Sequence, residues 1–466
     1  MKRSFNIPAV LLLTSILLTG CGKAPAPVAA AGHAMTLADS YNTKEVREYT
    51  DEGMVEEPLA TYSSGDGLCV IKVMPSYYDV TLDYEKGSRA DVGAAYGTLI
   101  REKMPEFIDT MEPYLFENIR MAYGGEFDPD AIEIRRTILF DSWRPEYQEE
   151  ISAFAEAVSG GVHGITEDHV LSYEEAVLMQ MIPDALRPTC CSALSLWGSK
   201  TVTGDRITLR NLEWNLGSNN QMGMINAVTH MKNGDRTLTA ISVLGLFDII
   251  SGINDDGVFA AILDVGSVQN EAFVFEGKKC YTMELRYALE EYSSARELGG
   301  FMTGESGDFT WCHNLIISDA DDSFCAEDCV SQVVESGHGR SVLRDCDTPI
   351  FEGLSWDSED SLCVVNSFTS AGNQDGFTGS SSNIVRFAKY NEWVKALDKF
   401  SPKDVKDLIT QETVDQYIVQ NVHSNGSAQL ILVDYHTGSV QVAFSGPDGV
   451  ADKPDFIEVE SFTAGL

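Results

Sequence analysis

Apolar residues in the first half of the chain recur at the three- and four-residue spacing of helices. Between about Ala90 and Met181 this period dominates, and the stretch from Ile151 to Val158 shows it clearly. Ser172 and Glu175 have the spacing of a capping box that opens a further helix. Pro188 then closes this part of the chain, so we predict a helical segment up to that point.

After Thr189 the pattern changes to short runs of β-type residues, several closed by Gly or Asp-Gly turns. These runs predict strands at Leu194–Trp197, Arg206–Leu212, Ala227–Met231, Thr237–Val243, Val258–Val265, Asn314–Ser318, Ser361–Val365, Ala428–Asp434 and Ser439–Phe444. Helical spacing interrupts them at Thr282–Tyr292 and Ile384–Leu397. Many strands with a few segregated helices predict a layered α+β fold.

The first residues have the layout of a secretory signal. Two basic residues precede an apolar stretch from Ile7 to Leu18, which is short for a bilayer span, and the sequence Leu-Thr-Gly ends at Cys21. This ending resembles the lipobox of bacterial lipoproteins, so Cys21 is predicted to carry the lipid. An ordinary signal peptide cut elsewhere is the alternative. No later run of about 18 apolar residues occurs, and we expect a cell-surface lipoprotein outside the cytoplasm, anchored to the membrane by its N-terminal lipid.

Composition narrows the classes of partner. The chain has 71 acidic against 33 basic residues and a net charge of −38, with no basic stripe to offset it. Because a phosphate backbone must be met by clustered Lys and Arg, this balance excludes nucleic acid as a partner. A solvated acidic surface explains the charge, and 44% hydrophobic residues are enough to bury a large core.

Ten cysteines in an exported chain raise the question of disulfides and metals. A chain of this length can fold without disulfides or a structural metal. Apart from Cys21, Cys190 and Cys191, seven cysteines remain, and an odd number cannot all pair. Cys325 and Cys329 have the spacing of half a zinc site, but no matching second pair follows. We therefore expect no metal.

A pair of cysteines, Cys190-Cys191, lies where the helical part meets the first strand of the second half. A lone buried cysteine is usually an inert small hydrophobe. Here Ser192 and Gly198 follow it, and Arg210-Asn211-Leu212-Glu213-Trp214 comes about twenty residues later. The combination resembles the cysteine-type N-terminal nucleophile (Ntn) hydrolases. Within them it is most similar to the acyl-coenzyme A:6-aminopenicillanic acid acyltransferase (penicillin acyltransferase) branch, with choloylglycine hydrolases and acid ceramidase as more distant relatives.

Further motifs follow in the order that this resemblance implies. Upstream, Glu149 to Gly161 is similar to the acidic and glycine-containing stretch of the acyltransferase prosegment. Downstream stand four more segments: Gly252 to Val258, Val365 to Phe368, Ser381 to Phe387 and Val422 to Ser424. Each motif is weak alone, and five in the expected order favour the resemblance. It implies a four-layer αββα Ntn-hydrolase sandwich preceded by a mainly helical prosegment.

The chemistry of this class explains why a cysteine is needed at a new N-terminus. A thiol on the first residue lies beside a free α-amine with a pKa of about 7.7 to 8, which can act as its base. The chain must therefore be cut before the cysteine, by attack of the thiol on the preceding carbonyl. The family pattern places the cut between Cys190 and Cys191, and Cys190 as the first mature residue is the alternative.

The resemblance also implies roles for other residues. Arg210 would orient the cysteine and lower the pKa of its thiol. Glu213 stands where the family usually carries Asp, which holds the α-amine. Asn366 would donate its amide to the oxyanion. Asp264 falls where bile-salt hydrolases carry an oxyanion-hole Asn, although an ionised carboxylate cannot donate. Arg386 would either structure the site or meet a substrate carboxylate; a surface ion pair is the alternative for Glu213 and Arg386.

These expectations combine into one hypothesis. Residues 1–20 form the signal peptide, 21–45 a flexible tether after the lipidated cysteine, 46–190 the prosegment and 191–466 the catalytic region. The enzyme would act on a non-peptide amide bond of a small N-acyl substrate through a thioester, without a cofactor, while the prosegment remains associated. The alternatives are a bile-salt hydrolase and a catalytically silent, ligand-binding lipoprotein of the same fold.

Overall fold

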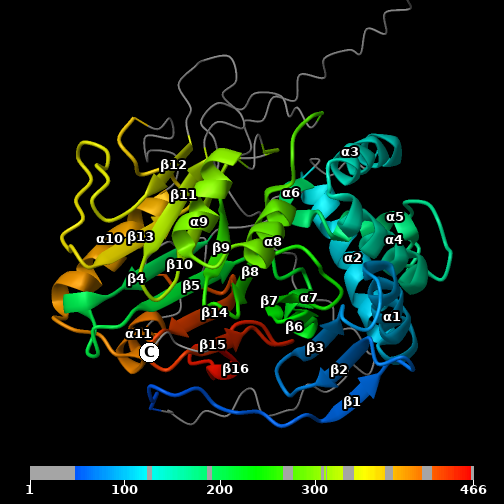
Figure 1. Ribbon diagram of the computed structural model, residues 1–466, viewed down its shortest axis with the longest axis horizontal. Helices are drawn as coiled ribbons and strands as arrows, with labels where there is room; N and C mark the ends of the chain where they lie inside the picture. The colour runs from blue at the N-terminus through cyan, green and yellow to red at the C-terminus, as the bar shows by residue number, and fades with distance from the viewer. Residues whose placement is uncertain are drawn as a thin grey trace, which may run out of the picture.

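The computed structural model describes residues 48–122, 128–185, 191–265, 276–305, 309–310, 312–328, 341–372, 381–411 and 422–462. The predicted signal peptide, tether, Cys21 and Cys190 lie outside the described residues. Most of the described chain is organised around two β-sheets (Figure 1).

The larger sheet has ten strands in the order β1-β2-β3-β6-β7-β8-β9-β10-β11-β12. Their bounds are Ala60–Ser63, Cys69–Val73, Tyr78–Asp83, Asn226–Asn233, Arg236–Val243, Ser251–Asn254, Phe259–Asp264, His313–Ser318, Ser323–Asp328 and Ser341–Arg344. All neighbours are antiparallel except β3 and β6, which run parallel. Strands from before and after Cys191 thus share one sheet.

The smaller sheet has six strands in the order β13-β4-β5-β14-β15-β16, all antiparallel. They span Ser361–Val365, Ser192–Leu196, Ile207–Glu213, Ser427–Asp434, Ser439–Phe444 and Ile457–Ser461. Alternate residues divide between two cores because strand side chains point to opposite faces. In β4, for example, Ala193 belongs to the large core between the sheets, whereas Leu194 and Leu196 belong to a second core under two helices.

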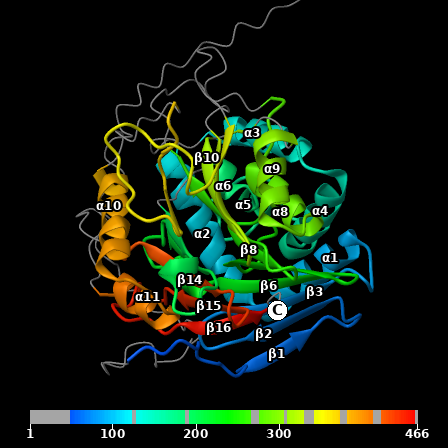
Figure 2. The same cartoon turned by 60° about the vertical axis from the view of Figure 1, so that its left-hand side comes forward.

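Helices cover the outer faces of both sheets. On the smaller sheet lie α10 (Ser381–Ala396) and α11 (Pro402–Ile409), whose apolar residues share the second core. On the larger sheet, α8 (Tyr281–Glu291) contacts β7 to β9, and α9 (Ala295–Gly300) with the π-helical turn η2 (Phe301–Glu305) contacts β10 and β11. Figure 2 shows the two helix pairs on opposite sides of the strands. The predicted α+β class and its αββα layers are therefore confirmed.

The segment before residue 186 is mainly helical, as predicted. It contains α1 (Arg89–Lys103), α2 (Pro105–Ala122), α3 (Pro129–Asp141), α4 (Pro145–Ser159), α5 (Tyr173–Met179) and α6 (Ile182–Ala185), most of them gathered on the right of Figure 1. Strands β1 to β3 precede these helices and were not predicted. Helices α1 and α4 pack so closely that a Cβ on Gly93 would lie 2.1 Å from the Glu150 carbonyl oxygen.

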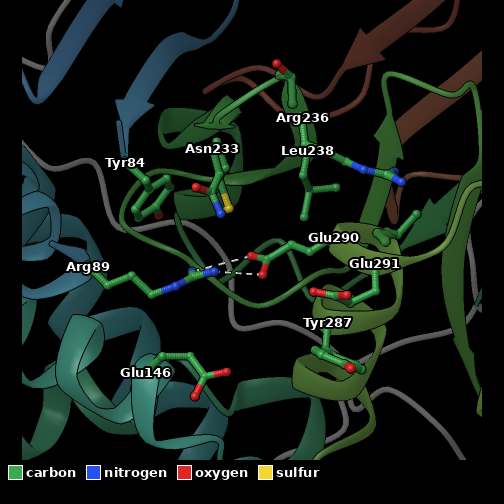
Figure 3. A pocket seen from close by; sticks show the side chains of 12 residues that line it. Tyr84, Arg89, Glu146, Asn233, Arg236, Leu238, Tyr287, Glu290 and Glu291 are labelled. Carbon is green, nitrogen blue, oxygen red and sulfur yellow. Dashed lines mark hydrogen bonds and ion pairs between the residues drawn. The ribbon is translucent and has the colours of Figure 1, made fainter. Parts of the chain in front are cut away.

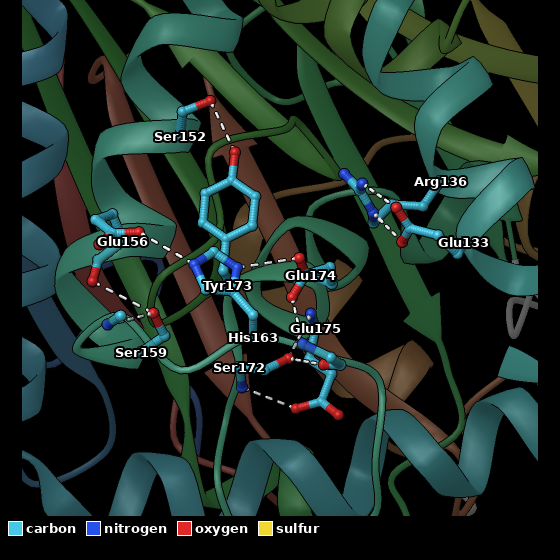
Figure 4. Close-up of polar contacts among 12 residues, drawn as sticks. Glu133, Arg136, Ser152, Glu156, Ser159, His163, Ser172, Tyr173, Glu174 and Glu175 are labelled. Carbon is cyan, nitrogen blue, oxygen red and sulfur yellow. Dashed lines mark hydrogen bonds and ion pairs between the residues drawn. The ribbon is translucent and has the colours of Figure 1, made fainter. Parts of the chain in front are cut away.

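The predicted capping box is present at the start of α5. The Ser172 hydroxyl accepts from Glu175 N at 3.2 Å, and the Glu175 carboxylate accepts from Ser172 N at 2.8 Å (Figure 4). These two bonds satisfy backbone donors that a helix leaves free at its N-terminus. Nearby, Glu174 bonds the ring of His163 and so ties the preceding loop to the same helix turn.

The predicted strands and helices after Thr189 are confirmed within a few residues at each end. The sequence pattern did not predict β8, β11, β12, β16, α9 or α11, nor the short turns η1 (Gly198–Lys200) and α7 (Gln221–Met224). Most of these are only four to six residues long, where periodicity is a weak signal. Within the described ranges, none of the helices is long and apolar enough to cross a membrane.

A buried charge cluster joins the helical segment to the sandwich. Arg286 of α8 donates to Glu150 of α4 at 2.7 and 3.2 Å, and both side chains are fully buried. Arg89 of α1 donates to Glu290 of α8 at 2.8 Å and lies between the rings of Tyr84 and Tyr147. The hydroxyls of Tyr84 and Tyr147 complete the cluster by donating to Glu150 and Glu290. Two positive and two negative charges thus neutralise one another across the boundary at Cys191.

Candidate active site

Four of the six predicted site residues lie at or next to strand ends. Cys191 precedes β4, Asn366 follows β13, Glu213 ends β5 and Asp264 ends β9, while Arg210 lies within β5. Antiparallel pairing brings these ends together, because β13 and β4 join Val365 to Ser192. The sixth residue, Arg386, comes from the second turn of α10. One edge of the sandwich therefore collects residues that are up to 195 positions apart.

Cys191 lies in the core between the two sheets. Its side chain is buried, and the Arg210 guanidinium donates to its Sγ at 3.3 Å. Arg210 also donates to the backbone oxygen of Ile262 in β9 at 3.0 Å, which fixes the guanidinium between the sheets. The contact with Sγ is the one that the predicted orienting role of Arg210 requires, and the role itself stays a prediction.

Burial has the largest effect on the pKa of the Cys191 thiol. It raises the pKa of Cys191, while Arg210 acts in the opposite direction and Asp264 adds to the rise. Burial also lowers the pKa of Arg210, against the effect of the nearby thiol. Arg210 thus lowers the pKa of the Cys191 thiol as expected, but this effect is smaller than the rise caused by burial. A thiol with a raised pKa must pass its proton to another group as it attacks.

The Glu213 carboxylate is bound on both oxygens. Ser424 donates its hydroxyl to one oxygen, and Arg386 approaches the other at 3.3 Å. Burial raises the pKa of Glu213, and both partners counteract the rise. Arg386 donates to the backbone oxygen of Cys191 at 2.6 Å as well, so it links Glu213 to Cys191 through one guanidinium. This buried placement differs from the surface ion pair considered as an alternative.

Arg386 also organises the two asparagines beside the cysteine. Its Nη2 donates to the Oδ1 atoms of Asn366 at 3.2 Å and Asn383 at 2.7 Å. The Asn366 side-chain amide then has its oxygen fixed, so its Nδ2 points away from Arg386 and donates to the Asp264 backbone oxygen at 2.6 Å. These contacts favour the structuring role of Arg386 over recognition of a substrate carboxylate.

Asp264 is held by an aromatic side chain. The Tyr281 hydroxyl donates to its carboxylate, and the Tyr281 ring stacks on His313 with centroids 4.3 Å apart. The backbone oxygen of Asp264 is the acceptor for Asn366. Asp264 is therefore part of the same cluster, with its carboxylate engaged by a hydroxyl donor.

Three further residues of this cluster received no role from the sequence. Ser424 and Asn383 lie inside segments quoted above for their resemblance, so a motif signal was present without a chemical reason to choose them. Tyr281 had no such signal, because it begins α8 and reaches Asp264 only through the packing of that helix on β9. The motif turn at Asn254 is structural instead, since its amide donates to two carbonyl oxygens at the end of α8.

Two cavities lie elsewhere. One, of about 340 Å³, is lined by Tyr84, Arg89 and Glu290 of the buried charge cluster and by their neighbours (Figure 3). The other, of about 420 Å³, lies beside α11. Neither is lined by any of the six predicted site residues. Across the ranges that the structure describes, no group of three or more His, Cys, Asp or Glu side chains is placed to hold a metal ion.

No family model matches the chain. Protein dcd1B from Dictyostelium discoideum is 21% identical over 166 residues, 34% of this chain and 33% of that protein, so the match spans about a third of its length. Among solved structures, the chain is similar to a Caenorhabditis elegans ortholog of N-acylethanolamine-hydrolyzing acid amidase, with a TM-score of 0.36 and 11% identity over 52% of this chain and 92% of that one.

Two bacterial structures are similar to the same degree. A variant of conjugated bile acid hydrolase from Clostridium perfringens has a TM-score of 0.31 and 12% identity, covering 59% of this chain and 98% of its own. Penicillin V acylase from Agrobacterium tumefaciens has a TM-score of 0.32 and 12% identity, covering 55% and 83%. Identities and TM-scores this low leave the family of the chain open.

Proposed function

We propose that this chain is a self-processing cysteine amidase or acyltransferase of the Ntn-hydrolase class, acting on the amide bond of a small N-acyl substrate. The observation that carries the proposal is a pair of hydrogen bonds to Cys191. Arg210 donates to its Sγ, and Arg386 donates to its backbone oxygen. A buried cysteine that served only for packing would not need two buried guanidinium groups, whose desolvation is costly.

Maturation would begin with attack of the Cys191 thiol on the carbonyl carbon of residue 190. The thiol proton passes to the amide nitrogen of Cys191 as the C–N bond breaks, so the α-amine is released and a thioester forms. Water hydrolyses the thioester, which restores the thiol and leaves a carboxylate on residue 190. The freed amine lies on the same residue as the thiol and supplies the base that a buried thiol requires.

Catalysis would repeat this chemistry on the substrate. The thiolate attacks the amide carbonyl, the amine leaves with a proton and the acyl group remains on sulfur until water or another amine takes it. Asn366 would donate to the oxyanion with the second proton of its Nδ2, since the first is given to the Asp264 backbone oxygen. The Glu213 carboxylate, held by Ser424 and linked by Arg386 to the Cys191 backbone oxygen, would accept from the new amine and orient it.

We also propose that residues 48–185 stay bound after cleavage as a second chain. Strand β3 pairs with β6 over six residues, and the buried charge cluster crosses the same boundary. Both interactions survive the loss of one peptide bond. The lipobox-like ending at Cys21 would anchor this complex to the membrane outside the cytoplasm.

The direct test follows the purified chain over time. Denaturing electrophoresis with N-terminal sequencing should find a fragment that begins at Cys191, and native mass should remain that of the whole chain. The processed protein should then hydrolyse members of a panel of N-acyl amides with varied acyl length. An intact chain after prolonged incubation would instead favour a silent binding protein.

Asn366→Ala should lower kcat by about 10² to 10³, because that is the usual effect of removing one oxyanion donor. KM should change far less, since the donor acts mainly on the charge that develops during the reaction. Steady-state kinetics on fully processed protein measure both constants. Asn226→Ala is the matched control: it deletes another buried amide, bonded to the Ser445 carbonyl oxygen at 2.8 Å, away from Cys191. Equal losses in the two variants would contradict the role of Asn366.

A further inference from the structure

A buried aspartate shortly before the proposed cleavage point is held by the part of the chain that follows it. Asp184 lies in α6 and is fully buried. Its carboxyl oxygens accept three hydrogen bonds, from Tyr281 N at 3.1 Å, from the Thr282 hydroxyl at 2.6 Å and from the Thr310 hydroxyl at 2.9 Å. None of the site roles described above uses this residue.

The donors connect Asp184 to the active site. Tyr281 and Thr282 begin α8, where free backbone N–H groups favour an acceptor. The same Tyr281 donates its hydroxyl to Asp264, and the Asp264 backbone oxygen accepts from Asn366. One short chain of hydrogen bonds thus runs from α6 to the proposed oxyanion donor.

We propose that Asp184 is a positioning residue for self-cleavage, which fixes α6 on α8 and so restricts the chain that leads to the Cys191 thiol. This inference rests on the proposed function. Helix α6 ends at Ala185, and the six Cα-to-Cα steps from there to Cys191 span at most about 22 Å. Since β4 holds the far end, anchoring α6 restricts the orientations of the scissile peptide. Holding two reacting groups in place is among the largest contributions to rate in intramolecular reactions.

The contacts themselves do not demand a negative charge. Burial raises the pKa of Asp184 to about 7. Asp264 adds to this rise. A second fully buried carboxyl, Asp248, has its own pKa raised by burial and by Asp184. Asparagine can therefore replace Asp184: its oxygen accepts from Tyr281 N and Thr310, and its amide can donate to the Thr282 hydroxyl. Alanine removes all three bonds.

The test measures the rate of chain cleavage after cell-free synthesis, by electrophoresis of timed samples. Asp184→Ala should slow cleavage at least about tenfold, equivalent to about 1.4 kcal/mol in the barrier. Asp184→Asn should stay within about threefold of the original rate. Thr282→Val should slow cleavage in the same direction and add little to Asp184→Ala. Thr201→Val, which deletes another fully buried hydroxyl, is the control and should have no effect.

The molecules of Asp184→Ala that do become cleaved should have unchanged kcat and KM, because positioning is needed only before the bond breaks. An unchanged cleavage rate in Asp184→Ala and Thr282→Val would overturn the proposal. A loss of activity in the cleaved molecules that matches the loss of cleavage rate would also overturn it, since Asp184 would then only support the fold. Failure of the unmodified chain to cleave before Cys191 would instead refute the proposed function itself.

Discussion

Replacing Cys191 with alanine should abolish both self-cleavage and amidase activity. The substitution removes the nucleophile of both reactions, and loss of the nucleophile in a hydrolase costs about 10⁶-fold in kcat. Electrophoresis should show only the uncut chain, and turnover of the best N-acyl amide should fall to background. Cys191→Ser should cleave slowly, because a hydroxyl is a weaker nucleophile than a thiol at neutral pH.

Two cysteine controls make this result specific. Cys190→Ala should still cleave and still turn over substrate, because that residue stays on the other fragment. Cys363→Ala removes a buried thiol on the face of β13 that packs under α10, and it should leave activity intact. Loss of cleavage in Cys190→Ala alone would move the mature N-terminus to that residue. Full activity in Cys191→Ala would eliminate the mechanism.

Replacing Glu150 with alanine should destabilise the protein by about 3–5 kcal/mol. The change removes the bidentate partner of the fully buried Arg286, whose Nε still donates to Glu290 at 3.0 Å, so that two arginines of the cluster share one carboxylate. It also removes the acceptor for the Tyr84 hydroxyl. Urea unfolding followed by circular dichroism measures the loss. In the cleaved protein the same variant should release the N-terminal fragment at lower urea, because the pair joins α4 to α8 across the cleavage point.

The matched control is an exposed ion pair. Asp322→Ala breaks the contact with Arg296 at 3.2 Å, in which both side chains are exposed, and should cost about 0–1 kcal/mol. A third variant replaces both Glu150 and Arg286 with apolar residues of similar size. It should recover part of the stability, since no unpaired buried charge remains. Equal effects of Glu150→Ala and Asp322→Ala would show that the buried charge cluster contributes little.

Local pattern was sufficient to predict most of the sandwich. Runs such as Ala428 to Asp434 and Ser361 to Val365 have the composition of buried strands, and both form strands at those positions. Strands β2 and β3 alternate buried and half-buried residues with equal regularity, yet they precede a long helical region and were not predicted. Strand β3 joins the sheet through the distant β6, and a pairing of that separation leaves no trace in a local window.

The site shows the same division. Motif resemblance selected six residues, and the fold brings all of them into one hydrogen-bonded cluster: Cys191, Arg210, Glu213, Asp264, Asn366 and Arg386. The resemblance did not indicate that burial would raise the pKa of the Cys191 thiol by more than Arg210 lowers it. Desolvation depends on every atom packed around a group, so no short segment encodes it.

By itself, the sequence determined the α+β class, the position of the change from helical to strand pattern at Cys191, and the residue types available for thiol chemistry. Only the tertiary structure decided that strands before and after Cys191 share one sheet, that Arg386 links Glu213 to Cys191, and that Asp184 contacts the start of α8. The reason is physical: periodicity and motifs reflect the local backbone, whereas sheet pairing, burial and charge pairing depend on segments far apart along the chain.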